Sequence, residues 1–162
     1  MSTTTEHETT ITASADVPTI EIVREFEAPP ERVFRAWTEP RQFAKWIGPR
    51  SLTTTIDRWD CETGGAYRYR QARDGEEVAA FFGSFHEVRP GERLVQTFTW
   101  EGQPDGVSLE TVIFEALPGD RCRVVSLGVV ESMALRDMII ASGMDTGVAE
   151  GYEKLDELLA DR

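Results

Sequence analysis

The stretch Ser142-Gly-Met-Asp-Thr-Gly-Val-Ala-Glu-Gly-Tyr-Glu-Lys-Leu-Asp-Glu-Leu-Leu159 has the pattern of an amphipathic helix, yet it carries a glycine at every fourth position. These glycines are Gly143, Gly147 and Gly151, and the apolar stripe beside them consists of Met144, Val148, Leu155 and Leu159. A glycine inside a helix costs about 1 kcal/mol relative to alanine. The spacing therefore indicates that another part of the molecule approaches this helix closely, or that space is kept beside it.

The helical pattern begins at Ser132, and a break near Gly143 is expected, with Ser142 and Asp145 as a candidate capping pair. Only Gly147 and Gly151 then lie inside the last helix. Two explanations for them stay open, close packing against a sheet or enlargement of a ligand cavity. A Gly147→Leu substitution separates them: lost binding in a folded protein favours the cavity, and global destabilisation favours packing.

The segments before this helix alternate between strand patterns and turn signals. Residues 19–27 form the expected first strand, and two short helices follow, each opened by proline, over residues 30–38 and 40–48. Strand patterns separated by hairpin-length links then predict an antiparallel meander. Its expected strands are residues 52–59, 66–72, 78–88, 93–100, 107–117 and 121–130. The order predicts an α+β domain in which a curved antiparallel sheet wraps around the long C-terminal helix.

The length and composition bound the domain organisation. A chain of 162 residues suits one domain, predicted here over residues 19–162. Residues 1–18 are rich in Thr and Ser and poor in large apolar side chains, so we expect them to be a disordered tail.

The charge balance excludes several partner classes. Lys and Arg number 17 against 29 Asp and Glu, a formal charge of −12, which argues against nucleic acid and anionic membrane surfaces as partners. No apolar stretch is long enough for a membrane helix, so a cytoplasmic protein is expected. Cys61 and Cys122 are expected to be free thiols, with a single bridge between them as the alternative. We expect neither a metal site nor a cofactor.

Several ordered sequence blocks resemble one known family. These blocks are Ala36-Trp37-Thr38-x-Pro40, Lys45-Trp46-Ile47-Gly48-Pro49, Asp60 before Gly64-Gly65, Gly83-x-Phe85-x-Glu87-Val88-x-Pro90-x-Glu92-Arg93-Leu94-Val95, Phe98-Thr99-Trp100 and Gly143-Met144 through Leu155. Together they resemble the family called activator of Hsp90 ATPase homologue-like, within the START-like, or SRPBCC, superfamily. The resemblance implies a helix-grip fold, in which about seven antiparallel strands grip the C-terminal helix with a cavity between them. Its relatives include lipid and hormone binders, cyclases and a chaperone activator, so the fold alone does not define the function.

The candidate site consists of side chains expected to line that cavity. From the sheet and the short helices these are Trp46, Phe85, Phe98 and Trp100, and from the last helix Met144, Gly147, Val148 and Gly151. No catalytic residue is predicted, since His86 is expected to face solvent and Asp60 suits a turn. Further polar candidates whose orientation the sequence leaves open are Ser108, Glu110, Arg68 and Arg70.

Three functions follow as hypotheses. The first is binding of a small hydrophobic or aromatic molecule between the sheet and the last helix, by a monomer or homodimer. The second is a protein-interaction module that acts on an Hsp90-type chaperone ATPase, as the family name implies. The third is a cyclase- or hydrolase-like enzyme that uses the cavity, for which fold analogy is the main support.

Overall fold

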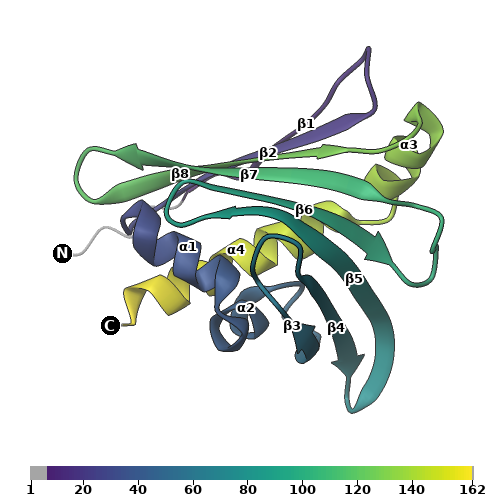
Figure 1. Ribbon diagram of the computed structural model, residues 1–162, viewed down its shortest axis with the longest axis horizontal. Helices are drawn as coiled ribbons and strands as arrows, with labels where there is room; N and C mark the ends of the chain where they lie inside the picture. Colours follow the sequence, from purple (N-terminus) through teal and green to yellow (C-terminus); the bar gives the residue numbers. More distant parts are fainter. Residues whose placement is uncertain (1–6, 162) are drawn as a thin grey trace.

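A computed structural model describes residues 7–161 (Figure 1). Its strands are β1 (Thr10–Ala13), β2 (Thr19–Phe26), β3 (Thr53–Trp59), β4 (Ala66–Arg73), β5 (Glu76–Arg89), β6 (Arg93–Trp100), β7 (Ser108–Leu117) and β8 (Arg121–Val129). Its helices are α1 (Pro30–Thr38), α2 (Pro40–Trp46), α3 (Met133–Ala141) and α4 (Met144–Ala160).

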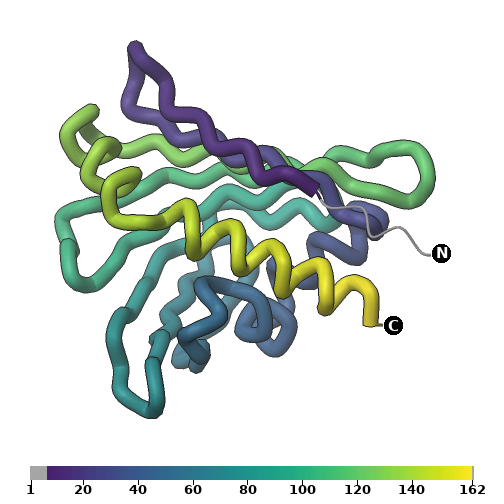
Figure 2. The backbone as a smooth tube through the Cα atoms, turned by 180° about the vertical axis from the view of Figure 1, so that it is seen from behind, coloured from purple at the N-terminus to yellow at the C-terminus, as the bar shows by residue number. Residues whose placement is uncertain are grey.

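The strands form one antiparallel sheet in the order β1-β2-β8-β7-β6-β5-β4-β3. The sheet is strongly curved, and α4 crosses its concave face, with α1 and α2 beside it (Figures 1 and 2). This confirms the predicted helix-grip architecture, and the meander strands lie within a few residues of their expected limits. The sheet has eight strands rather than about seven.

The additional strand is β1, which corrects the prediction for the N-terminal segment. Thr10 to Ala13 pair with β2 in the register Thr10↔Val23 to Ala13↔Ile20, so disorder over the whole of residues 1–18 is wrong. Backbone pairing with the free edge of β2 needs no apolar core pattern, and β-branched Thr and Ile suit an edge strand. Residues 1–6 lie outside the described residues.

The break between the two C-terminal helices lies at Gly143, as expected. Gly143 has φ of 86°, a left-handed conformation that glycine adopts without strain, and it directly precedes α4. The predicted capping pair is wrong, because Gly143 is the N-cap of α4 and Ser142 Oγ instead donates a hydrogen bond to the Ile139 carbonyl at 2.6 Å. Ser132 does cap α3, where its hydroxyl accepts from the Leu135 amide at 3.1 Å.

The interior glycines of α4 serve different purposes. A Cβ at Gly151 would lie 2.9 Å from the Trp46 carbonyl oxygen, so this glycine allows α4 to pack directly on the end of α2. A Cβ at Gly147 would meet only Pro49 Cδ, at an ordinary 3.7 Å. Close packing therefore explains Gly151 but not Gly147.

A buried ion pair fastens α4 to the sheet. Arg24 on β2 is almost fully buried and donates two hydrogen bonds to the Asp156 carboxylate, at 2.9 and 2.5 Å. Its guanidinium also lies 4.8 Å from the centre of the Phe26 ring. A bidentate arginine with an aromatic contact fixes orientation as well as distance, so this pair sets how α4 lies on β2.

Candidate functional site

The layer between the sheet and α4 is closed at one end and partly accessible at the other. Toward the C-terminus of α4, Tyr152, Leu155 and Leu159 are buried, and they belong to a core that also includes α1 and α2. Toward the N-terminus of α4, the side chains that face this layer keep part of their surface accessible. We call this second set the accessible end: Ile22, Phe81, Gln96, Phe98, Ser108, Glu110, Met144 and Val148.

Strand alternation explains which side chains reach this layer. On β7, Glu110 is in phase with Val112 and Phe114, which are buried in the core, so its side chain lies on the same inward face. The register places Gln96 of β6 on one side of Glu110 and Gly128 of β8 on the other. Gly128 has no side chain, and a Cβ there would lie 3.1 Å from Ser108 Oγ and 3.9 Å from Glu110 Oε2.

A line of polar groups crosses the sheet beside Glu110. The Tyr67 hydroxyl on β4 donates to the Thr97 carbonyl at 2.7 Å, and the Gln96 side-chain amide donates to the same hydroxyl at 3.4 Å. This reach across β5 requires Gly83, because a Cβ there would lie 2.7 Å from the Tyr67 hydroxyl and 1.9 Å from the Thr97 carbonyl. Gly83 therefore has a structural role in placing the tyrosine.

Glu110 combines burial with residual accessibility. Burial raises the pKa of its carboxyl from 4.5 to about 7, and Gln96 partly opposes that rise. No cationic side chain among residues 7–161 contributes to this pKa. Glu110 is therefore a carboxyl in the interior that takes or releases a proton near neutral pH.

The charge of Glu110 acts on three buried tyrosines. Burial raises the pKa of Tyr67, Tyr69 and Tyr152, and the charge of Glu110 raises each of them further. Tyr67 and Tyr69 belong to β4, whereas Tyr152 belongs to α4. The charge of the carboxyl thus influences tyrosines of both the sheet and the helix.

The predicted sheet and short-helix residues fall into two groups. Trp46 and Phe85 are 3% and 2% exposed and fill the core, where the Trp46 indole donates to the Ala36 carbonyl at 2.8 Å. Phe98 belongs to the accessible end and stacks on Phe81, with ring centres 5.2 Å apart and planes at 20°. Trp100 is 47% exposed at the end of β6, where its ring covers Gly102.

The predicted residues of α4 also fall into two groups. Met144 and Val148 lie at the accessible end. Gly147 and Gly151 instead face the connection between α2 and β3, next to Pro49 in one case and to Trp46 and Gly48 in the other. The structure thus brings Phe98, Met144 and Val148 to one end of the interior and leaves the two glycines on another contact.

The polar candidates are sorted by the face of the sheet. Arg68 and Arg70 point to the outer face, where both pair with Asp57, at 2.6 and 2.8 Å. His86 is exposed, as expected. Ser108 and Glu110 lie on the inward face, and the two-residue spacing from Glu110 to Val112 and Phe114 is the sequence signal for this orientation.

Sequence reasoning missed Phe81 and Gln96 of the accessible end, and also Tyr67, the core residue whose hydroxyl Gln96 contacts. Tyr67 and Phe81 appear in the sequence as ordinary strand aromatics, and Gln96 as one polar residue of a strand. Their proximity depends on the register between β4, β5, β6 and β7, which the sequence pattern does not define.

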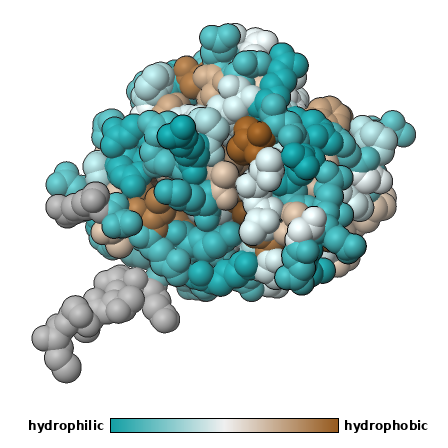
Figure 3. Space-filling model, turned by 90° about the horizontal axis from the view of Figure 1, so that it is seen from below, coloured by the Kyte–Doolittle hydropathy of each residue, from teal (hydrophilic) through white to brown (hydrophobic). Residues whose placement is uncertain are grey.

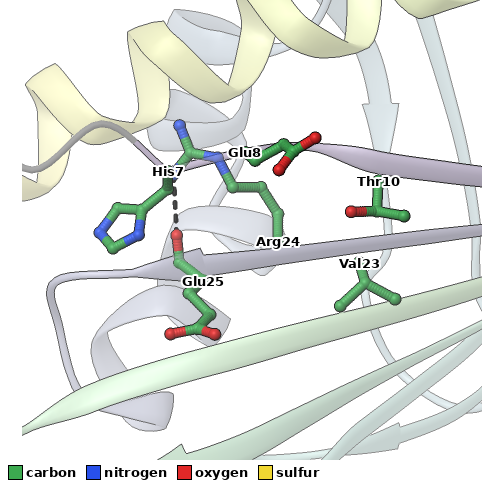
Figure 4. A pocket seen from close by; sticks show the side chains of 6 residues that line it. All are labelled: His7, Glu8, Thr10, Val23, Arg24 and Glu25. Carbon is green, nitrogen blue, oxygen red and sulfur yellow. Dashed lines mark hydrogen bonds between the residues drawn. The ribbon is translucent and has the colours of Figure 1, made fainter.

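Two pockets lie on the outside of the molecule. One, of about 290 Å³, is lined by His7, Glu8, Thr10, Val23, Arg24 and Glu25 (Figure 4). The Arg24 guanidinium in this pocket is already paired with Asp156, and the carboxylates of Glu8 and Glu25 also line the pocket. The pocket is therefore a poor site for an anion. The other, of about 580 Å³, lies between α1, the end of α4 and the turn at Gly119.

Hydrophilic side chains cover most of the face seen in Figure 3, and hydrophobic side chains occupy only small areas of it.

The order of the elements and the curved sheet around α4 define a helix-grip protein. The family model described as activator of Hsp90 ATPase homolog 1-like protein matches residues 27–160, so the chain belongs to this family and the resemblance is confirmed. At the level of the family, membership supports either a ligand-binding or an Hsp90-related module. No curated protein matches the sequence.

Solved structures from several bacteria are similar to this chain. A protein from Chromobacterium violaceum is 27% identical, with 89% of this chain and 99% of that one covered and a TM-score of 0.76. A protein from Arthrobacter aurescens is 26% identical, with 94% and 92% covered and a TM-score of 0.85. A protein from Mycobacterium smegmatis is 24% identical, with 96% and 99% covered and a TM-score of 0.84, a similarity that concerns the fold.

Among residues 7–161, no helix has the length and apolar character needed to cross a membrane.

Proposed function

We propose that this protein binds a small hydrophobic or aromatic molecule at the accessible end, between the sheet and the first turns of α4. The observation that carries the proposal is the contrast within one interior layer. Around Tyr152 and Leu155 the layer is closed, whereas Phe98, Val148 and their neighbours keep accessible surface. An apolar interior with a few convergent polar groups is the usual character of a small-molecule site.

The side chains of this end suit a flat apolar ligand. Phe81 and Phe98 present a stacked aromatic pair, and Tyr69 lies against Phe81 with ring centres 5.2 Å apart. Aromatic rings favour offset or edge contacts with a further ring. The hydroxyl of Tyr67, the amide of Gln96 and the carboxyl of Glu110 supply the few polar groups that would orient it.

The test is a titration with Nile red, a neutral apolar dye whose fluorescence rises in apolar surroundings. Val148→Phe adds bulk at the accessible end, and Val129→Phe adds the same bulk on the outer face of β8, where Val129 is exposed. We expect Val148→Phe to weaken dye binding about tenfold or more and Val129→Phe to leave it unchanged. Equal binding by all three proteins, or no binding by the wild type, contradicts the proposal. If Val148→Phe fails to fold, Ser108→Phe makes the same test from β7.

A second candidate function is interaction with an Hsp90-type chaperone, and one observation favours it. The outer face of the sheet carries exposed Leu109, Leu127 and Val129, and the register places Leu109 directly opposite Val129. Adjacent exposed apolar side chains are typical of protein-binding surfaces. This function predicts that the protein changes the ATPase rate of an Hsp90-type chaperone, and that Leu109→Ser removes the change. An unchanged ATPase rate on addition of the wild type contradicts it.

A further inference from the structure

Glu110 is a partly accessible acid on the inward face of the sheet, and it has no cationic partner among the described residues. The other interior charge near α4, Arg24, is engaged by Asp156 and acts on the pKa of Tyr152 but not on that of Glu110. A carboxylate enclosed by protein is costly unless a cation or several donors pair with it. Glu110 has one amide neighbour, Gln96, opposite it on β6, and this leaves its charge largely uncompensated.

The surroundings of Glu110 are those that bind organic cations. On the inward face of the sheet, successive ring contacts form an aromatic row that ends at Phe98, with ring centres 5.2 to 6.2 Å apart: Tyr67, Tyr69, Phe81 and Phe98. Aromatic faces attract ammonium groups through their negative quadrupole, most strongly where water is excluded. Gly128 lies beside the carboxylate, with the Glu110 Oε2 atom 3.9 Å from the place a Cβ would occupy, so a group bound there meets no side chain from β8.

We propose that the ligand of the accessible end is an apolar molecule with one basic nitrogen, whose ammonium group pairs with the Glu110 carboxylate while its apolar part lies against Phe81 and Phe98. This inference rests on the proposed function and names the chemical class of the ligand. The net charge of −12 further favours a cationic ligand over an anionic one.

The test compares two probes with the same apolar part, 1-naphthylmethylamine and 1-naphthylmethanol, by isothermal titration calorimetry at pH 8. At this pH an aliphatic amine is protonated. We expect the amine to bind about tenfold more tightly than the alcohol to the wild type. Glu110→Gln, which keeps the shape of the side chain, abolishes this preference. The matched control is Glu115→Gln, which removes the same charge from the exposed outer face of β7 and retains the preference.

Each outcome decides one question. If the alcohol binds as tightly as the amine, or if Glu110→Gln keeps the preference, the amine inference is wrong while apolar binding stands. If neither probe binds the wild type, the proposed function fails and the inference fails with it. A circular dichroism spectrum and melting curve of Glu110→Gln confirm that the variant is folded. If the variant is unfolded, the test instead measures the ratio of the amine and alcohol affinities of the wild type at pH 5.5 and at pH 8. The raised pKa of Glu110 lies between these two pH values, so the ratio should change. An unchanged ratio overturns the inference.

Discussion

Glu110 is the residue at which burial and charge oppose each other most directly. Its pKa is raised to about 7 because the interior disfavours the carboxylate. The folded protein therefore holds this proton more tightly than the unfolded chain. The resulting stabilisation is fully present below the ordinary pKa of 4.5 and is lost as the pH rises through about 7.

Replacing Glu110 with Gln removes this ionisation, so the variant should gain stability relative to the wild type as the pH rises. Between pH 5 and pH 8 we expect the difference in unfolding free energy to change in favour of Glu110→Gln, by at most about 3 kcal/mol. Urea unfolding at both pH values measures it. Glu115→Gln serves as the control: its difference from the wild type in unfolding free energy should change little between the two pH values. A difference that is the same at both pH values would contradict the raised pKa.

Gly147 and Gly151 provide a matched pair of substitutions in one helix. Gly151→Ala places a Cβ 2.9 Å from the Trp46 carbonyl, so α4 must move away from α2. We expect a loss of about 1–3 kcal/mol in the free energy of unfolding. Gly147→Ala meets only Pro49 at an ordinary distance, and its better helix propensity should add up to about 1 kcal/mol. Thermal melts of the two variants test this, and the same sign for both would show that the packing assignment is wrong.

At the scale of elements, α4 is held to the sheet through Arg24 of β2. Asp156→Asn leaves a buried guanidinium without its charge partner, which costs about 3–5 kcal/mol in fully buried pairs. The expected loss is toward the lower end, because the Asp156 side chain is 38% exposed. Chemical denaturation measures the change. Glu157→Gln, which breaks the exposed pair with Arg50 at 2.6 Å, should cost much less; an equal loss in the two variants would contradict the anchoring role.

The elements themselves could be predicted from the sequence, because turn signals and proline-opened helices are local. Hairpin turns such as Asp74-Gly75 and the start of α2 at Pro40 follow from a few adjacent residues. The strand at Thr10 could not be predicted in this way, since its partner is the edge of β2 and its own pattern is weakly apolar. The break at Gly143 was predictable, but its cap was not.

The candidate site was less predictable than the elements because it depends on contacts between residues far apart in the sequence. Phe98, Met144 and Val148 follow from apolar periodicity alone. Trp46 and Phe85 have the same local signal, yet the way that α2 and β5 pack makes them core residues. Glu110 gains its neighbours through strand register and through the absence of side chains at Gly83 and Gly128, which depends on contacts across the sheet.

At the scale of the whole molecule, a closed core and an accessible end lie along the same helix. The core lies at α1, α2 and the second half of α4, and the accessible end is where we propose that a ligand binds. We propose that the ligand binds on the concave face of the sheet and not on the outer apolar surface.

The most direct measurement is the pattern of intermolecular nuclear Overhauser effects between 1-naphthylmethanol and the methyl groups of the protein. Binding at the accessible end predicts contacts to Ile22 and Val148, which lie between the sheet and α4. Contacts confined to Leu109, Leu127 and Val129 on the outer face, or none at all, would contradict the account.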